Sequence, residues 1–412
     1  MSSKTRLEES WGLLGMKFNT YKMEDALESI IDYRGKTPKK SDFGIMTLSA
    51  KSVKNGYIDY SQCYYISADE YKRFMVRGIP KKGDVLLTTE APLGVVAILD
   101  RDDVAIAQRL LTIRGKKDIL DTNYLYYYLK APIGQGKLHE RESGTTVTGI
   151  KQSEFRKITI NIPDIRVQRK IADILGLIDN KIKINMQIND NLTQQARSLY
   201  QAWFVDYEPF GGSVPSDWSA ASLGQVAIMK TDSWSPVKNP NDIVEHYSIP
   251  AYDEKHYPVF ESATDIKSNK YIITPDSVMI SKLNPDIKRI WRPMCLSANP
   301  VCSTEFIVYE ARKNDQKDFI YSILDSVPFF NYLCAHTTGS TNSRQRATPK
   351  ATLDFNFQLP PDNVIKDFCQ LVTPMYDLIA SNIVENQSLA QTRDSLLPRL
   401  MSGELDVSNL DI

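Results

Sequence analysis

Residues 35–38, Gly-Lys-Thr-Pro, are the first stretch of this chain with the residue types for phosphate chemistry. In a Walker A loop, a Gly-Lys-Thr run closes a loop that opens with another glycine five residues earlier. Position 30 is isoleucine, so the spacing excludes that loop. We interpret the stretch as a turn after a strand. The alternative is a cluster of cations near a turn that meets a DNA backbone, made of Arg34, Lys36, Lys39 and Lys40.

Catalytic signatures are weak elsewhere in the sequence. Asp84 and Glu90 raise the hypothesis of a nuclease, but no lysine follows two residues after the glutamate. None of the Asn-Pro pairs at 239, 284 and 299 is followed by an aromatic residue, as base methylation would require. Five cysteines without a Cys-x-x-Cys pair and four scattered histidines argue against a zinc site. The pattern indicates a non-catalytic component with no metal site.

Polar side chains on loops are the candidates for contact with DNA, because base edges are read by arginine, lysine, asparagine and glutamine. For each one, a solvated surface charge is the competing interpretation. The tyrosine row 124–128 is interpreted as helix core rather than a stacking platform. The DNA-binding candidates are Arg34, Lys36, Thr37, Gln108, Arg109, Thr145, Thr146, Lys151, Lys282, Asn284, Lys288, Arg289, Ser340, Asn342, Arg344 and Arg346.

Composition limits the class of protein. The 412 residues include 42% hydrophobic and 24% charged residues, and no apolar run reaches the roughly 20 residues of a membrane span. The N-terminus lacks a signal pattern, so we expect a soluble, cytoplasmic protein. Because 50 Lys and Arg balance 50 Asp and Glu, a nucleic-acid surface must be local or shared with a more basic partner.

The chain repeats itself with an offset of 197 residues. An alternating strand closed by proline occurs at 158–163 and again at 355–360, and each is followed by a long helical segment, 166–204 or 363–401. Upstream, residues 82–92 resemble residues 275–285. The repeat predicts two similar modules, each followed by a long helix.

Both long segments carry a heptad-like seam with two successive asparagines, Asn185 and Asn189 in one and Asn382 and Asn386 in the other. Polar residues in a seam weaken packing but fix register. If the helices pair antiparallel about residue 187, Asn185 meets Asn386 and Asn189 meets Asn382. The alternative is two ordinary amphipathic helices packed on separate domains. At 1.5 Å per residue, each helix is a spacer of roughly 55 Å.

Domain boundaries follow from these patterns and from the Gly- and Pro-rich linker at 207–215. We predict a first globular domain at 1–163, a central spacer helix at 164–210, a second globular domain at 211–360, and a C-terminal spacer helix and tail at 361–412. The expected fold class is α+β: two globular α/β domains separated by two long helices in an antiparallel coiled coil, as a pseudo-two-fold internal repeat.

This order of elements resembles the specificity (S) subunit of type I restriction-modification systems, over residues 20 to 408. The resemblance rests on Gly35-Lys-Thr-Pro38, on Leu223-Gly224 at the second module, on the strand-proline-helix joints at 163 and 360, and on the two helix endings. The second module departs from the pattern, since Lys230-Thr-Asp-Ser-Trp-Ser-Pro236 replaces a Gly-x-Thr-Pro turn.

The resemblance implies a DNA-recognition subunit without catalysis of its own. Each recognition domain would read one half of a bipartite, asymmetric site in double-stranded DNA, and the helices would dock two adenine-methyltransferase (M) subunits, with or without two restriction (R) subunits. S-adenosylmethionine would then be bound by the methyltransferase, and ATP and Mg by the motor-nuclease. Two other hypotheses stay open: a nuclease using Asp84 and Glu90, and a coiled-coil adaptor or decoy without a cognate methyltransferase.

Overall fold

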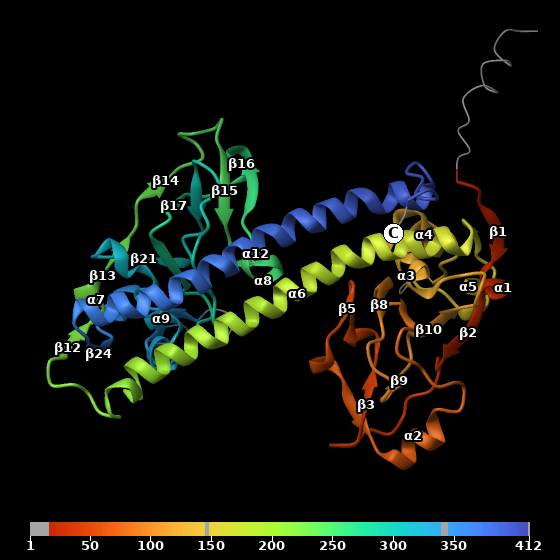
Figure 1. Ribbon diagram of the computed structural model, residues 1–412, viewed down its shortest axis with the longest axis horizontal. Coiled ribbons are helices and arrows are strands. Elements are labelled where there is room, and N and C mark those ends of the chain that lie inside the picture. The colour runs from red at the N-terminus through yellow and green to blue at the C-terminus, as the bar shows by residue number, and fades with distance from the viewer. Residues whose placement is uncertain (1–15, 145–147, 339–344, 411–412) are drawn as a thin grey trace, which may run out of the picture. The chain divides into compact units, whose positions relative to one another are not determined.

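The computed structural model describes residues 16–144, 148–338 and 345–410. The chain forms two compact units, one made of residues 1–180 together with 389–412 and the other of residues 181–388 (Figure 1). Both mix helices and strands, which confirms the α+β prediction in its broad form. The boundaries between units fall inside the two long helices, and the predicted domain boundaries at 163, 210 and 360 stay predictions.

The first unit is built on an antiparallel four-stranded sheet in the order β2–β10–β7–β8. A second sheet, β6–β3–β9, pairs β3 with β9 in parallel, and β1 pairs with β11. The strands are β1 Asn19–Lys22, β2 Leu27–Asp32, β3 Ile45–Leu48, β4 Val53–Lys54, β5 Tyr57–Ile58, β6 Tyr64–Ile66, β7 Val85–Thr89, β8 Leu93–Ile98, β9 Val104–Ile106, β10 Leu110–Gly115 and β11 Thr159–Ile162.

Short helices cover the sheets of the first unit. They are α1 Met23–Ala26, α2 Ala68–Phe74, α3 Thr122–Lys130, α4 Pro132–His139 and α5 Gln152–Arg156. Asp121 begins α3, since its carboxylate accepts the backbone N–H groups of Asn123 and Tyr124 at 2.9 and 3.0 Å. Every tyrosine of the row 124–128 is buried in the core of this unit, which confirms the interpretation of that row as helix core.

The second unit repeats this topology. Its four-stranded sheet has the order β13–β21–β18–β19, and its other sheet, β14–β17–β20–β15–β16, again contains one parallel pair, β15 with β20. The strands are β12 Ser219–Ser222, β13 Ala227–Lys230, β14 Ser233–Trp234, β15 Ile243–Tyr247, β16 Val259–Ser262, β17 Lys270–Ile272, β18 Ser277–Ser281, β19 Ile290–Trp291, β20 Pro300–Cys302, β21 Phe306–Ala311, β22 Thr337–Thr338, β23 Arg346–Ala347 and β24 Asn356–Leu359.

Five short α-helices complete the described part of the second unit: α7 Leu223–Val226, α8 Ile249–Lys255, α9 Lys317–Asp325, α10 Val327–Ala335 and α11 Pro349–Thr352. Backbone bonds that close the fold recur in both units. The Met23 N–H donates to Ile158 O at 2.7 Å, and the Leu223 N–H donates to Phe355 O at 2.8 Å. The internal repeat seen in the sequence is therefore a repeat of backbone structure as well.

The long helices are α6, Ile165–Phe204, and α12, Asp362–Ser402, within one residue of the predicted limits. Each contributes to the cores of both units. In the first unit, Ile171 and Leu175 of α6 share a core with Leu397 and Leu400 of α12. In the second unit, Tyr200 and Phe204 of α6 share a core with residues 365–376 of α12.

The seam asparagines of the second unit are hydrogen bonded as the sequence predicted. Asn185, only 1% exposed, donates through Nδ2 to Asn386 Oδ1 at 2.9 Å and to the Glu385 carboxylate at 2.7 Å. Asn382 Nδ2 donates to Asn189 Oδ1 at 2.8 Å. Residue numbers rise along one helix as they fall along the other, so the segments run antiparallel here. Antiparallel pairing along the whole length of both helices stays a prediction.

Replacing both members of one pair, Asn185→Leu with Asn386→Leu, is expected to leave the chain folded but loosen the register of these segments. Leucine packs well in a seam, but it removes the directional bond that distinguishes one register from its neighbours. Hydrogen exchange should show faster exchange across 181–189 and 382–388 at an unchanged melting temperature. Unaltered exchange would show that the asparagines do not set the register.

Candidate nucleic-acid interface

Three separate stretches of the first unit meet at one end of strand β7. The Thr89 N–H donates to Arg109 O at 3.0 Å, and the Ile150 N–H donates to Thr89 O at 2.9 Å. The Arg34 guanidinium donates to Ile150 O at 3.0 Å. We call this surface, with Glu90, the first edge. It brings together residues that lie more than a hundred positions apart in the sequence, such as Arg34 and Ile150.

Residues next to the first edge are available to solvent. A turn with Lys36 N–H donating to Tyr33 O at 3.2 Å follows β2, which confirms the interpretation of the Gly-Lys-Thr-Pro stretch. Gly35 has a φ of +76°, a conformation that glycine adopts without a steric cost. Lys36, Thr37 and Lys151 are exposed, and Gln108 is half-buried.

Arg109 is the most constrained side chain of the first edge. Its φ is +70°, an uncommon value for a residue with a long side chain. Its Nε lies 2.8 Å from Glu90 Oε1, and the arginine side chain is 54% exposed. Such backbone conformations persist where the surrounding structure fixes them, here through the Thr89 N–H bond to Arg109 O.

The second unit has an equivalent edge at the end of β18, with the same backbone connections. The Lys282 N–H donates to Glu305 O at 2.9 Å, and the Ala347 N–H donates to Lys282 O at 2.8 Å. The Asn284 N–H donates to Gln345 O at 3.0 Å. Arg346 Nε donates to Glu305 Oε2 at 3.0 Å, and this bond raises the pKa of the arginine. We call Lys282, Asn284, Glu305, Arg346 and Ala347 the second edge.

The two edges match position by position. The sheet register makes Thr89 equivalent to Lys282, and Arg109 equivalent to Glu305. Isolated bridges pair Glu90 with Gly149 and Leu283 with Arg346, so Gly149 corresponds to Arg346. Ala91 and Asn284, which are equivalent, both have positive φ, 52° and 48°. Sequence reasoning missed Glu90 and Glu305 as parts of these edges, because only the sheet pairing places them beside an arginine.

Some candidates do not contribute to either edge. Arg289 is 7% exposed, and its guanidinium binds the Asp253 carboxylate of α8 at 2.6 and 2.9 Å. Lys288 pairs with Asp325 at 2.5 Å. Both cations are therefore paired with carboxylates inside the second unit. Thr145, Thr146, Ser340, Asn342 and Arg344 lie outside the described residues.

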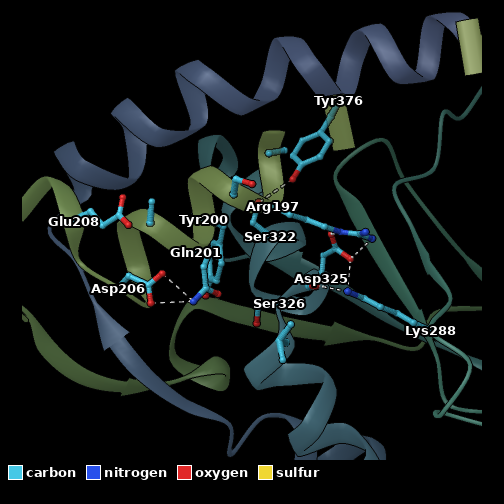
Figure 2. Close-up of a pocket in the computed structure, with 14 residues that line it drawn as sticks. Arg197, Tyr200, Gln201, Asp206, Glu208, Lys288, Ser322, Asp325, Ser326 and Tyr376 are labelled. Carbon is cyan, nitrogen blue, oxygen red and sulfur yellow. Dashed lines mark hydrogen bonds and ion pairs between the residues drawn. The ribbon is translucent and has the colours of Figure 1, made fainter. Parts of the chain in front are cut away.

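Lys288 instead lines a pocket of about 530 Å³ in the second unit, between the end of α6, the α9–α10 turn and α12. Figure 2 shows Arg197 and Lys288 converging on Asp325, and Tyr376 pointing at Ser322. The Arg197 guanidinium holds the Asp325 carboxylate at 2.6 and 3.0 Å. Burial lowers the pKa of Lys288, although the Asp325 carboxylate opposes this effect.

The corresponding region of the first unit carries two larger side chains that share one carboxylate. Tyr127 donates to Asp179 at 2.9 Å, and Arg393 donates to the other oxygen of the same carboxylate at 2.7 Å. The repeat places Ser322 and Ala196 where the first unit has Tyr127 and Arg393. Two smaller side chains therefore contribute to the open pocket of the second unit.

The carboxylates of the nuclease hypothesis are far apart. Asp84 precedes β7 and Glu90 follows it, which separates them by about 20 Å at roughly 3.3 Å per strand residue. Asp84 is 1% exposed, and its carboxylate binds the Arg114 guanidinium at 2.6 and 2.9 Å. This bond is the main cause that raises the pKa of Arg114. The geometry makes Asp84 a structural residue that cannot share one metal ion with Glu90.

Within residues 16–144, 148–338 and 345–410, no three His, Cys, Asp or Glu side chains gather in a way that could hold a metal ion. Across the same ranges, none of the helices has the length and apolar character to cross a bilayer.

Comparison with known proteins finds relatives of one kind. A family model described as Type I restriction modification DNA specificity domain matches residues 17–194. The type I specificity domain is therefore matched over most of the first unit and the beginning of the second. It is 26% identical, over 84% of this chain and 82% of the relative, to the type I restriction enzyme MjaIX specificity subunit of Methanocaldococcus jannaschii. It is 23% identical, over 79% and 87%, to the HindI specificity subunit of Haemophilus influenzae.

The fold of the chain is similar to that of a solved structure. It matches the crystal structure of a type I restriction-modification S subunit from M. genitalium with a TM-score of 0.61 at 15% identity, covering 94% of this chain and 96% of the other. Both relatives are specificity subunits by name, the class of protein that the sequence of this chain resembles.

The buried pair of the first specificity domain can be tested directly. Asp84→Ala is expected to destabilise the first unit by about 3 kcal/mol, because it leaves the Arg114 charge without its bidentate partner. Differential scanning calorimetry should show the loss in one transition. Asp103→Ala, which removes an exposed partner of Arg101, is the control and should change little. An unchanged transition for Asp84→Ala would remove the structural role assigned to this residue.

Proposed function

We propose that this chain is the DNA-recognition subunit of a type I restriction-modification complex, and that each unit reads one half of a bipartite, asymmetric site in double-stranded DNA. The observation that carries the proposal is the repeated edge. Two units share one backbone framework, yet present different side chains on it. A protein of this kind is suited to reading two different short sequences with the same fold.

The side chains around the first edge divide naturally by role. Exposed cations such as Lys36 and Lys151 suit contacts with phosphates, which supply affinity but carry no sequence information. Polar groups on the edges or directly beside them suit contacts with base edges. They are Arg34, Gln108 and Arg109 in the first unit and Lys282, Asn284 and Arg346 in the second. Thr145, Thr146, Ser340, Asn342 and Arg344 remain candidates from the sequence alone.

The long helices are proposed to pair antiparallel and to hold the recognition units apart, leaving a stretch of DNA unread between the half-sites. The asparagine bonds of the second unit and the Asp179–Arg393 pair of the first support this arrangement. A helix of 40 residues is about 60 Å long, which sets the scale of the separation.

The helices are also proposed to dock two methyltransferase subunits. Apolar side chains that are 39–59% exposed on the described helices of the second unit support this role, since a lone solvated helix gains nothing from them. They are Ile184, Met186, Ile188, Leu371 and Leu378. In this proposal, S-adenosylmethionine belongs to the methyltransferase. ATP and Mg belong to the restriction subunits of a complex that has them, and the location is cytoplasmic.

The test is to co-express the chain with the methyltransferase encoded beside it and to map adenine methylation across the genome by single-molecule sequencing. A split motif that vanishes when this chain is deleted supports the proposal. A co-purifying complex without methylation and without sequence preference in binding would favour the alternative, a coiled-coil adaptor or a decoy subunit without a cognate methyltransferase.

Exchanging residues 215–360 for the same region of another specificity subunit should alter one half of the methylated motif and leave the other intact. This region lies wholly inside the second unit, so the first edge keeps its framework. Methylation mapping of the exchanged chain provides the measurement. A change in both half-sites would contradict independent reading by the two units.

A further inference from the structure

We propose that Arg109 and Arg346 read a guanine in each half-site, and that Glu90 and Glu305 position them to do so. This inference rests on the proposed function and extends it to single base pairs. Both arginines belong to the matched edges, both are about half exposed, and both are held by a glutamate of the same edge. The glutamates act through the arginines and are positioning residues.

The geometry of each pair leaves the end of the guanidinium available for a base. Glu90 takes the Nε side of Arg109 at 2.8 Å, and Glu305 takes Nε and Nη2 of Arg346 at 3.0 and 3.3 Å. A guanidinium has five N–H donors in a fixed fork. The terminal nitrogens therefore keep donors that match O6 and N7 of guanine, the bidentate contact that arginine makes most often in the major groove.

A carboxylate on one side of the fork also restricts its rotation. An arginine free in solution loses rotamer entropy when it binds a base, and a preformed bond removes part of that loss before DNA arrives. For Arg109, the backbone adds a second restraint, because its φ of +70° is fixed by the Thr89 N–H bond to its carbonyl. The first edge thus presents a side chain whose direction is set by two independent contacts.

The two arginines occupy different positions in their edges, and the structure gives a steric reason for this difference. In the second unit it occupies position 346, which corresponds to Gly149 in the first. A Cβ built on Gly149 would lie 2.7 Å from Thr89 O and 2.8 Å from Glu90 Cβ, so a side chain does not fit there. The first edge places its arginine at position 109, where the second has Glu305.

Each pair carries no net charge, which separates it from the phosphate contacts. Neutralising phosphates makes affinity depend steeply on salt, whereas a neutral Arg–Glu pair adds little to that dependence. Arg109 and Lys36 lie in the same unit, but the loss of each side chain should therefore have a different effect on DNA binding. Loss of Arg109 changes which base is preferred, and loss of Lys36 weakens binding to all sequences.

The experiment is selection of DNA from a randomised library by the complex of this chain with its methyltransferase. Arg109→Ala should reduce the preference for guanine at one position of one half-site by about tenfold to a hundredfold, with the other half-site unchanged. Arg346→Ala should do the same in the opposite half-site. Arg109→Lys should not restore the preference, because an ammonium group lacks the fork.

Substitutions of the glutamates test the positioning role more directly than substitutions of the arginines. Glu90→Gln should weaken the guanine preference at the same position that Arg109→Ala affects, by a smaller factor. Lys36→Ala should lower the slope of log affinity against log salt by about 1 and leave the base preferences unchanged. Arg101→Ala, an exposed ion-paired arginine beyond the other end of β7, and Lys313→Ala, beyond the far end of β21, are matched controls for the two edges.

Three outcomes separate the possibilities. A wild-type complex that selects no split motif contradicts the proposed function itself. A wild-type motif that survives Arg109→Ala and Arg346→Ala unchanged overturns this inference and leaves the proposed function intact. A motif in which Glu90→Gln alters a position untouched by Arg109→Ala overturns the positioning role of Glu90. A normal melting temperature for each folded variant makes these outcomes interpretable.

Discussion

Two backbone connections at the end of one central strand hold together both the first edge and the second edge. They join the end of β7 to the residue before β10 and to residue 150, and they recur in the second unit between Lys282, Glu305 and Ala347. Backbone groups bond in the same way whatever side chains they carry. The framework can therefore stay constant while the residues on it change from Thr89 and Arg109 to Lys282 and Glu305, which is what a module that reads different sequences requires.

Periodic features were predictable from the sequence because they depend on local spacing. The heptad-like seam gave both long helices within one residue of their limits, and the repeated asparagines gave their contacts in the second unit. The burial of the tyrosine row was also predictable, since a run of aromatic residues in a short capped helix is stabilised mainly by packing in the core. In each case, neighbouring residues in the sequence determined the outcome.

The Arg–Glu pairs inside the two edges could not be predicted from the sequence, because the order of the strands in the sheet determines them. Nothing local places Glu90 beside Arg109 or Glu305 beside Arg346, and the offset between the modules changes from 193 residues at the end of β7 to 196 at the start of β10. Arg289 shows the opposite case. The composition of its loop suggested an exposed side chain that contacts DNA. In the structure, the guanidinium is buried and binds the Asp253 carboxylate of α8. Long-range partners decide whether a charged side chain faces water.

Both long helices are shared between the units, and this has a consequence for how the protein is made. The first unit consists of residues 1–180 and 389–412, so Leu397, Leu400 and Met401 complete a core begun near residue 23. A chain emerging from the ribosome cannot finish its first unit until these residues, more than 370 positions after Met23, have been added. The second unit, formed from the continuous stretch 181–388, has all its parts earlier. Synthesis thus runs from the N-terminus, yet the N-terminal unit is the later one to be completed.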